Sequence, residues 1–320
     1  MRPFFCTTCR TWLAWGVRAR GCPKCRSLER HRAFALLLPA LAELAGPGIC
    51  LDVAPATCLD LTLGELDTLQ VVRVDFDPAA DRRTVDVQAS VTQLPFPDGS
   101  AQLVMCSHVL EHVPDDRAAM RELGRVLSDT GIGLVVVPYR PGRTDEDPDA
   151  STEERIRRFG QADHVRYYGD DFEDRLAESG LQYLATDFAA VLPEEAITLS
   201  RLNGAERFWL VRPAGAAPLP PLAELASATR ALAVKVVETA HTDTGPMMAG
   251  LQLATYRIDG QLKEIDRLTA LLNGRNDRIV QLKAERRAQR PLRTKLVRRA
   301  KKDARRVVGK LRQVVSPPSD

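Results

Sequence analysis

Two histidines and a glutamate near the middle of the chain stand at a spacing that could do chemistry. They occur in the stretch SHVLEHVPDD as His108, Glu111 and His112. In this order they spell a zinc-binding signature of certain metallopeptidases, in which two histidines on one helix bind the metal. Pro114 follows His112 by two residues, however, and the residue before a proline is disfavoured in a helix. The context therefore argues against a peptidase.

Four cysteines near the N-terminus have the spacing of a metal site of another kind. They form two Cys-x2-Cys knuckles, Cys6 with Cys9 and Cys22 with Cys25, separated by twelve residues. Two such knuckles can offer four thiolates to a tetrahedral Zn²⁺. Two disulfides or four free thiols are the alternatives, and a reducing compartment disfavours the disulfides. We predict a structural zinc site, which has no open position for catalysis.

The composition predicts one substantial core with one or two smaller units. The chain has 320 residues, of which 44% are hydrophobic. The N-terminal residues have no apolar segment typical of an export signal, and the longest apolar stretch, 33–46, is too short to span a bilayer. We therefore expect a cytoplasmic protein. The net charge of +3 conceals a basic C-terminus, because residues 283–312 hold fourteen Lys or Arg against Glu285 and Asp303.

Short apolar strands alternate with helical patterns along the middle of the chain. Helices are expected at 27–44, 57–69, 115–127 and 170–180. Strands are expected at 48–53, 70–76, 84–88, 101–107, 132–138, 181–188 and 206–212. This alternation is typical of an α/β fold with a mostly parallel sheet wound on both faces. The histidine motif then follows the carboxyl end of a buried strand, where ligands of such sheets bind.

Several blocks of the sequence, in order, resemble the class I S-adenosylmethionine-dependent methyltransferases, in the branch of the type 11-like domain. The blocks are CPKCRSLERHR, LPFPDGSAQLVMCSHVLEHVPDDRAAMRELGRVLSDTGIGLVVVP and RRFGQADHVRYYGDDFEDRLAESG. The resemblance covers residues 1–212. It implies a zinc-knuckle unit at 1–30 and a Rossmann-like methyltransferase domain at 31–212 with a doubly wound, mostly parallel, seven-stranded sheet. It also implies methyl transfer from S-adenosylmethionine to a small-molecule or glycan/lipid-linked acceptor.

The resemblance assigns cofactor contacts to residues that follow the first four strands. Asp75 and Phe76 match the position that binds the ribose hydroxyls, for which a carboxylate supplies two acceptor oxygens. The full set of implied contacts is Asp52, Ala54, Pro55, Asp75, Phe76, Asp86, Val87, Ser107 and His108. The stretch LDVAPATC departs from the family, which has a glycine-rich loop here. The alternatives are a strand-end carboxylate for Asp52 and a solvated turn after Asp75.

The same resemblance suggests residues for chemistry and for binding the acceptor. His108, Glu111 and His112 share one helix face, so they could converge on a metal or on an acceptor hydroxyl; the alternative is that Glu111 and His112 satisfy backbone groups. The long connection at 139–172 is expected to cover the acceptor. Its candidate contacts are Arg158, His164, Arg166 and Tyr168, for which surface salt bridges are the alternative.

The C-terminal third has a different organisation. A Pro/Ala linker and a helix are expected at 213–250, followed by a heptad pattern at 251–282 that predicts a coiled coil and a homodimer. A helix folded back on the catalytic domain is the alternative. The basic tail, 283–320, combines a narrow apolar stripe with cations, which favours an anionic membrane surface over nucleic acid; a solvated tail is the third reading. Peripheral attachment at the inner membrane face would follow. The competing function is a non-catalytic scaffold on a methyltransferase fold, dimerised by the coiled coil.

Overall fold

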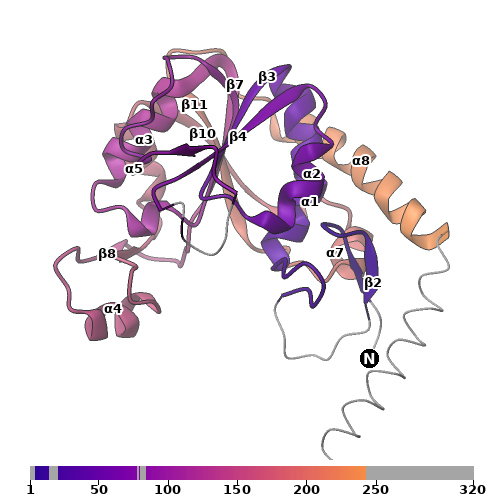
Figure 1. Cartoon of the computed structure of the whole chain (residues 1–320), viewed down its shortest axis with the longest axis horizontal. Coiled ribbons are helices and arrows are strands. Elements are labelled where there is room, and N and C mark those ends of the chain that lie inside the picture. The colour runs from indigo at the N-terminus through magenta and orange to yellow at the C-terminus, as the bar shows by residue number, and fades with distance from the viewer. Residues whose placement is uncertain (1–3, 14–20, 78, 80–83, 243–320) are drawn as a thin grey trace, which may run out of the picture. The chain divides into compact units, whose positions relative to one another are not determined.

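The computed structural model describes residues 4–13, 21–77, 79 and 84–242 (Figure 1). Contacts divide the chain into two compact units, Met1–Leu253 and Ala254–Asp320. The expected coiled coil at 251–282 and the basic tail at 283–320 lie outside the described residues. Within the described part of the chain, no helix is both long and apolar enough to cross a membrane.

A seven-stranded sheet forms the centre of the first unit, as the sequence predicts. Its strands lie in the order β10-β11-β7-β6-β3-β4-β5. All neighbours from β5 to β7 pair in parallel, whereas β11 runs antiparallel to both β7 and β10. The strands are β3 (Gly48–Val53), β4 (Leu69–Asp75), β5 (Val87–Gln88), β6 (Ala101–Ser107), β7 (Leu127–Val136), β10 (Leu181–Asp187) and β11 (Arg207–Pro213). The first five in chain order are arranged 3-2-1-4-5 across the sheet, as in doubly wound folds.

The edge strand β5 is shorter than the expected strand at 84–88. The Asp86 carboxylate accepts a hydrogen bond from the backbone N–H of Arg73 at 2.8 Å, and the Asp86 N–H donates to the Arg73 carbonyl at 2.9 Å. A side chain thus takes the donor that a regular ladder would use. The ladder with β4 therefore begins only at the Val74 and Val87 pair.

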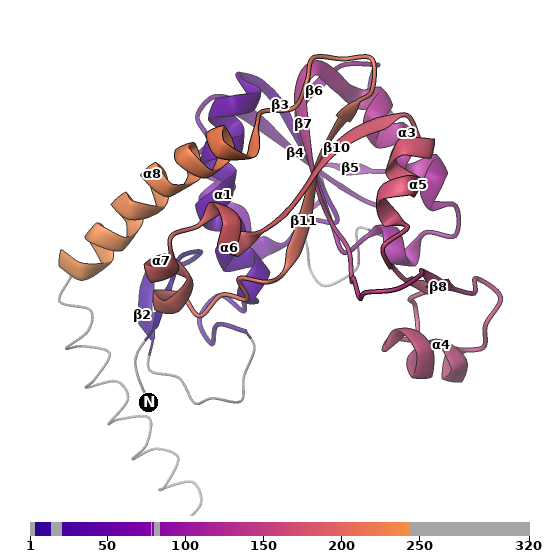
Figure 2. The same ribbon diagram turned by 180° about the vertical axis from the view of Figure 1, so that it is seen from behind.

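Helices cover both faces of the sheet (Figure 2). Helices α1 (Glu29–Ala45) and α8 (Leu222–Thr242) pack together on one face, and α3 (Asp116–Val126) and α5 (Phe172–Glu178) cover the other. Successive residues of β6 supply the two cores in turn, because strand side chains alternate between faces. Leu103 and Met105 point to the α1 side, whereas Val104 and Cys106 point to the α3 side.

Short elements complete the unit. Asp115 caps α3, as expected, by accepting a hydrogen bond from the Ala118 N–H at 2.8 Å. The helix expected at 57–69 is shorter and ends at Gly64. The remaining elements are β1 (Phe4–Cys6), β2 (Thr11–Leu13), η1 (Thr57–Leu59), α2 (Asp60–Gly64), η3 (Leu110–His112), β8 (Asp145–Glu146), α4 (Thr152–Phe159), β9 (Arg166–Tyr167), α6 (Phe188–Val191) and α7 (Glu194–Leu199).

The N-terminal hairpin, β1 and β2, is attached to the helical face of the domain. The indole N–H of Trp12 donates to the Ala240 carbonyl near the end of α8 at 3.0 Å. The buried guanidinium of Arg32 donates to the carbonyls of Ser27, Ser200 and Arg201. These bonds satisfy buried polar groups on both sides, so they hold the cysteine-bearing segment against α7 and α8.

Candidate active site

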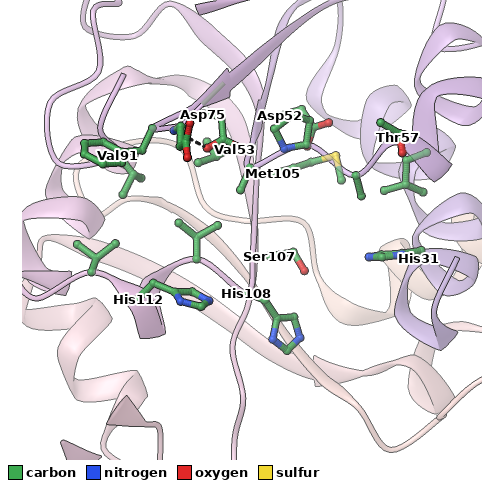
Figure 3. Close-up of a pocket in the computed structure, with 18 of the residues that line it drawn as sticks. His31, Asp52, Val53, Thr57, Asp75, Val91, Met105, Ser107, His108 and His112 are labelled. Carbon is green, nitrogen blue, oxygen red and sulfur yellow. Dashed lines mark hydrogen bonds between the residues drawn. The ribbon is translucent and has the colours of Figure 1, made fainter. Parts of the chain in front are cut away.

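A cavity of about 980 Å³ opens at the carboxyl ends of β3, β4 and β6. Asp52, Asp75 and Ser107 line it from the ends of these three strands. Figure 3 shows Asp52 and Asp75 along one wall, with His108 and His112 along the opposite wall. The volume is at the upper end of the range for ligand pockets, which leaves room for two molecules side by side.

Asp75 is one of two buried carboxylates that line this cavity; the other is Asp52. Only 8% of the surface of Asp75 is exposed, and its Oδ1 accepts the Asp77 backbone N–H at 3.0 Å. Phe76, the next residue, also lines the cavity, and its ring is 74% exposed. A buried acceptor beside an exposed aromatic ring suits a ligand that combines hydroxyl groups with a flat apolar part.

The turn after β3 has a backbone conformation that glycine usually adopts, although its residue is Ala54. Ala54 has φ of 55°, in the left-handed region, and its N–H donates to the Val74 carbonyl at 2.8 Å. His108, at the end of β6, has φ of 56°. An L-residue with a Cβ pays about 1–2 kcal/mol in this conformation. Both strained residues line the cavity, and strain of this kind gathers at functional sites.

Asp86 and Val87 do not line the cavity, which is a correction to the expected adenine contacts. The carboxylate of Asp86 is engaged with Arg73, at the edge of the sheet. The loop a few residues later lines the cavity instead, at Ala89, Ser90, Val91 and Thr92. The sequence missed this offset because the expected strand at 84–88 was drawn too long.

His108 and Glu111 form a buried pair, although His108 lies outside the helical turn η3 and the expected shared helix face is not formed. His108 Nδ1 lies 3.0 Å from Glu111 Oε1, and Glu111 is fully buried in η3. Burial lowers the pKa of His108, but the hydrogen bond with Glu111 and the nearby carboxylate of Glu206 outweigh it and raise the pKa above its usual value. His112 forms no hydrogen bond with this pair. Its Nδ1 lies 3.2 Å from Asp163 Oδ2.

Three of the four expected acceptor contacts have structural partners. Arg166 is buried and donates to the carbonyls of Leu110, Val113 and Pro114. Tyr168 is buried, and its hydroxyl donates to Asp116 at 2.9 Å.

Arg158 pairs with Asp145 and Asp147. The fourth residue, His164, is buried against His112, with ring centroids 4.6 Å apart. None of the four lines the cavity. The sequence singled out residue types that bind acceptors, but it carries no measure of their burial.

One wall of the cavity comes from a segment that the sequence did not assign to it. Arg26, Arg30 and His31 line the cavity from the start of α1 and the loop before it. His31 Nδ1 accepts the Leu28 N–H at 3.2 Å, and burial lowers the pKa of His31 to about 3, so the ring is neutral near pH 7. The block CPKCRSLERHR, which contains these three residues and is part of the family resemblance, could have indicated that this segment belongs to the site.

The four N-terminal cysteines come together. Cys6 Sγ lies 3.6 Å from Cys25 Sγ, Cys9 Sγ lies 3.8 Å from Cys22 Sγ, and all four sulfurs lie within 4.8 Å of one another. Four sulfurs at about 2.3 Å from a tetrahedral zinc would be about 3.8 Å apart. The donor set therefore fits a structural zinc ion.

Comparisons with known proteins agree with the α/β interpretation. Residues 50–135, from β3 to β7, match the methyltransferase domain family. A probable S-adenosylmethionine-dependent methyltransferase of Mycobacterium tuberculosis is 36% identical over 85 residues, which cover 23% of this chain and 31% of that protein. The uncharacterized methyltransferase YcgJ of Bacillus subtilis is 36% identical over 80 residues, which cover 25% of this chain and 30% of that protein. The chain thus spans about a third of the length of these curated relatives.

Solved structures give similarities at lower identity. The crystal structure of YcgJ covers 55% of this chain and 94% of its own, with 23% identity and a TM-score of 0.35. A putative methyltransferase from Bacillus halodurans covers 56% of this chain and 96% of its own, with 19% identity and a TM-score of 0.34. Residues 50–135, which match the methyltransferase domain family, include most of the strand ends around the cavity.

Proposed function

We propose that this protein transfers a methyl group from S-adenosylmethionine to a small-molecule or glycan/lipid-linked acceptor. The observation that supports this most directly is buried Asp75 at the end of β4, inside the segment that matches the methyltransferase domain family. Its carboxylate would accept hydrogen bonds from the ribose hydroxyls, while Phe76 would cover a flat face of the cofactor. Asp52, Ala54, Pro55 and Ser107, which also line the cavity, would surround the rest of the cofactor.

His108 would act as the base toward the acceptor. Glu111 holds His108 Nδ1, and Nε2 lies 3.8 Å from Glu206 Oε1, beyond hydrogen-bond distance. A carboxylate on one ring nitrogen fixes the tautomer and leaves the other nitrogen to take a proton. The raised pKa of His108 makes the ring a better proton acceptor, and His112 would contact the acceptor from the same wall.

Calorimetry with S-adenosylmethionine tests this proposal. The full chain should bind the cofactor, and Asp75→Asn should weaken binding by about ten- to a hundredfold, because hydrogen bonds to a buried charged acceptor contribute about 1.5–3 kcal/mol. Asp67→Asn, at an exposed carboxylate outside the cavity, is the matched control and should bind as the parent does. Absence of any binding would favour the scaffold alternative. Equal affinity in all three proteins would remove Asp75 from the cofactor site.

We also propose that Cys6, Cys9, Cys22 and Cys25 bind one structural zinc. Purified protein should contain about one zinc per chain, and Cys22→Ser should lose it together with the fold of the N-terminal hairpin, because binding energy at such sites is folding energy. Cys58→Ser changes a half-buried thiol outside the quartet and should keep the metal. Metal analysis decides the matter: zinc-free protein, or zinc retained in Cys22→Ser, would contradict the proposal.

A further inference from the structure

A second group of ligand-forming side chains lies behind His112. Glu111, His112 and His164 each offer one ligand atom, and these atoms lie within 4.8 Å of one another. Glu111 and His164 come from segments that a backbone hydrogen bond holds together, from the Val165 N–H to the Glu111 carbonyl at 2.9 Å. The histidine expected to contact the acceptor is thus placed beside the motif in SHVLEHVPDD, which the sequence alone could not show.

Two polar atoms of this group are buried and have no partner. Glu111 is fully buried, and its Oε2 has no hydrogen-bond partner in the described structure. His164 is 5% exposed, and its Nδ1 likewise has none. A buried carboxylate oxygen without a partner costs several kcal/mol unless a cation or a donor satisfies it. Two such atoms in one cluster indicate a site that would favour a bound cation.

The hydrogen bonds that hold His164 and Glu111 in place leave one lone pair on each side chain available to a metal ion. The His164 ring forms a hydrogen bond with the backbone of Phe159. Because Nδ1 has no partner, this bond belongs to Nε2, which carries the proton and leaves the Nδ1 lone pair for a ligand. Glu111 Oε1 is held by His108 at 3.0 Å, so Oε2 is oriented as well. Metal-binding histidines and carboxylates are fixed by such outer hydrogen bonds in general.

We propose that Glu111, His112 and His164 bind one divalent transition-metal ion. Two imidazoles with one carboxylate favour ions such as Zn²⁺, Fe²⁺ or Co²⁺ over Mg²⁺ and Ca²⁺, which prefer oxygen ligands. Ligand atoms of one ion at about 2.1 Å lie roughly 3–3.4 Å apart, so the cluster must contract slightly. The part-exposed ring of His112 can provide this shift by leaving Asp163.

The open coordination positions would face the cavity. His112 and Asp163 both line it, whereas Glu111 and His164 lie behind them. Three protein ligands leave positions for water or for an oxygen of a bound molecule, and a metal there lowers the pKa of that oxygen. The chemical class that this site would favour is a molecule with a hydroxyl or carbonyl oxygen.

Cobalt titration of the full chain, with its cysteines saturated by zinc, tests the site without a cofactor or an acceptor. One Co²⁺ per chain should bind with weak visible bands of nitrogen and oxygen ligation, and with no thiolate charge-transfer bands. His164→Gln and Glu111→Gln should each weaken binding at least tenfold. His31→Gln is the matched control, because His31 lines the same cavity across from His112 (Figure 3) and should leave the affinity unchanged.

Thermal unfolding, measured without added metal, checks that each variant folds. Addition of Co²⁺ should then raise the midpoint of the parent and of His31→Gln but not that of His164→Gln, because a ligand stabilises only the state that binds it. Excess Zn²⁺ should displace Co²⁺, and excess Mg²⁺ should not. No Co²⁺ bound to the zinc-loaded chain, an affinity that both cluster variants retain, or equal displacement by Mg²⁺ would overturn the proposal.

Discussion

At the scale of single residues, three residues that line the cavity have left-handed backbone: Arg26, Ala54 and His108. The strain at Ala54 leads to a direct prediction. Ala54→Gly should raise the free energy of unfolding by up to about 1 kcal/mol, because glycine escapes a Cβ penalty of about 1–2 kcal/mol and loses about 0.5–1 kcal/mol in chain entropy. Urea denaturation measures the change.

Ala56 is the matched control two residues further on. Its φ is −103° and its ψ is 107°, which is ordinary extended backbone. Ala56→Gly should therefore lower the free energy of unfolding by about 0.5–1 kcal/mol, with no strain to relieve. The changes in the free energy of unfolding of the two variants should differ by at least about 1 kcal/mol, which is the Cβ penalty that only Ala54→Gly relieves. If they lose stability equally, Ala54 is not strained.

The sequence predicted residue positions well at the ends of β3, β4 and β6, but not at the edge strand β5. Asp52, Asp75, Ser107 and His108 follow buried strands, and parallel strands bring their carboxyl ends to one edge of the sheet. Position relative to solvent was not predictable in this way. Arg166 has the charge and the location in sequence of an acceptor contact, yet it is 1% exposed.

At the scale of elements, Arg166 on β9 fixes the segment that follows β6. Its guanidinium donates to the carbonyls of Leu110, Val113 and Pro114, and it pairs with Glu146 on β8 at 3.1 Å. This contact holds the segment that carries Glu111 and His112. We predict that Arg166→Leu lowers the free energy of unfolding by about 3–5 kcal/mol, since it removes a charged donor from three carbonyls and one of the two arginines that pair with Glu146. Chemical denaturation provides the measurement.

Arg158→Leu serves as the comparison, because both arginines were expected to contact the acceptor. Arg158 pairs with the carboxylates of Asp145 and Asp147 in a part-exposed position, and such pairs are screened by water. Arg158→Leu should lower the free energy of unfolding much less than Arg166→Leu does. Similar losses in the two variants would mean that the buried contacts of Arg166 do not hold the segment.

The elements themselves were predictable to different degrees. Strands β3 and β6 are mostly apolar runs, as sheets covered on both faces require, and both were expected at their observed places, whereas β7 begins at Leu127, before the expected strand at 132–138. The edge strand β5 was not, because a side-chain bond from Asp86 replaces its first ladder bond. The docking of the N-terminal hairpin depends on Trp12 and Ala240, which are 228 residues apart. No local pattern encodes such a contact.

At the scale of the whole molecule, α8 belongs to the core of the first unit rather than to a separate linker. Leu225, Ala233 and Val237 of α8 are buried in the same cluster as Leu37 and Leu41 of α1. The expected Pro/Ala linker is thus confined to the residues before Leu222. The expected homodimer contact and the expected membrane contact both fall on residues outside the described part of the chain.

We propose that the basic tail, residues 283–320, binds an anionic membrane surface while the heptads at 251–282 form a dimer. Fourteen Lys or Arg in 283–312 would each contribute about 1 kcal/mol near anionic headgroups, and two tails in one dimer add avidity. Full-length protein should therefore sediment with anionic vesicles, not with neutral ones, and salt should release it. Truncation after Leu282 keeps the heptads and should abolish sedimentation while leaving the binding of S-adenosylmethionine unchanged. Equal sedimentation of the truncated chain, or tighter binding of the full chain to duplex DNA at the same salt, would contradict the membrane assignment.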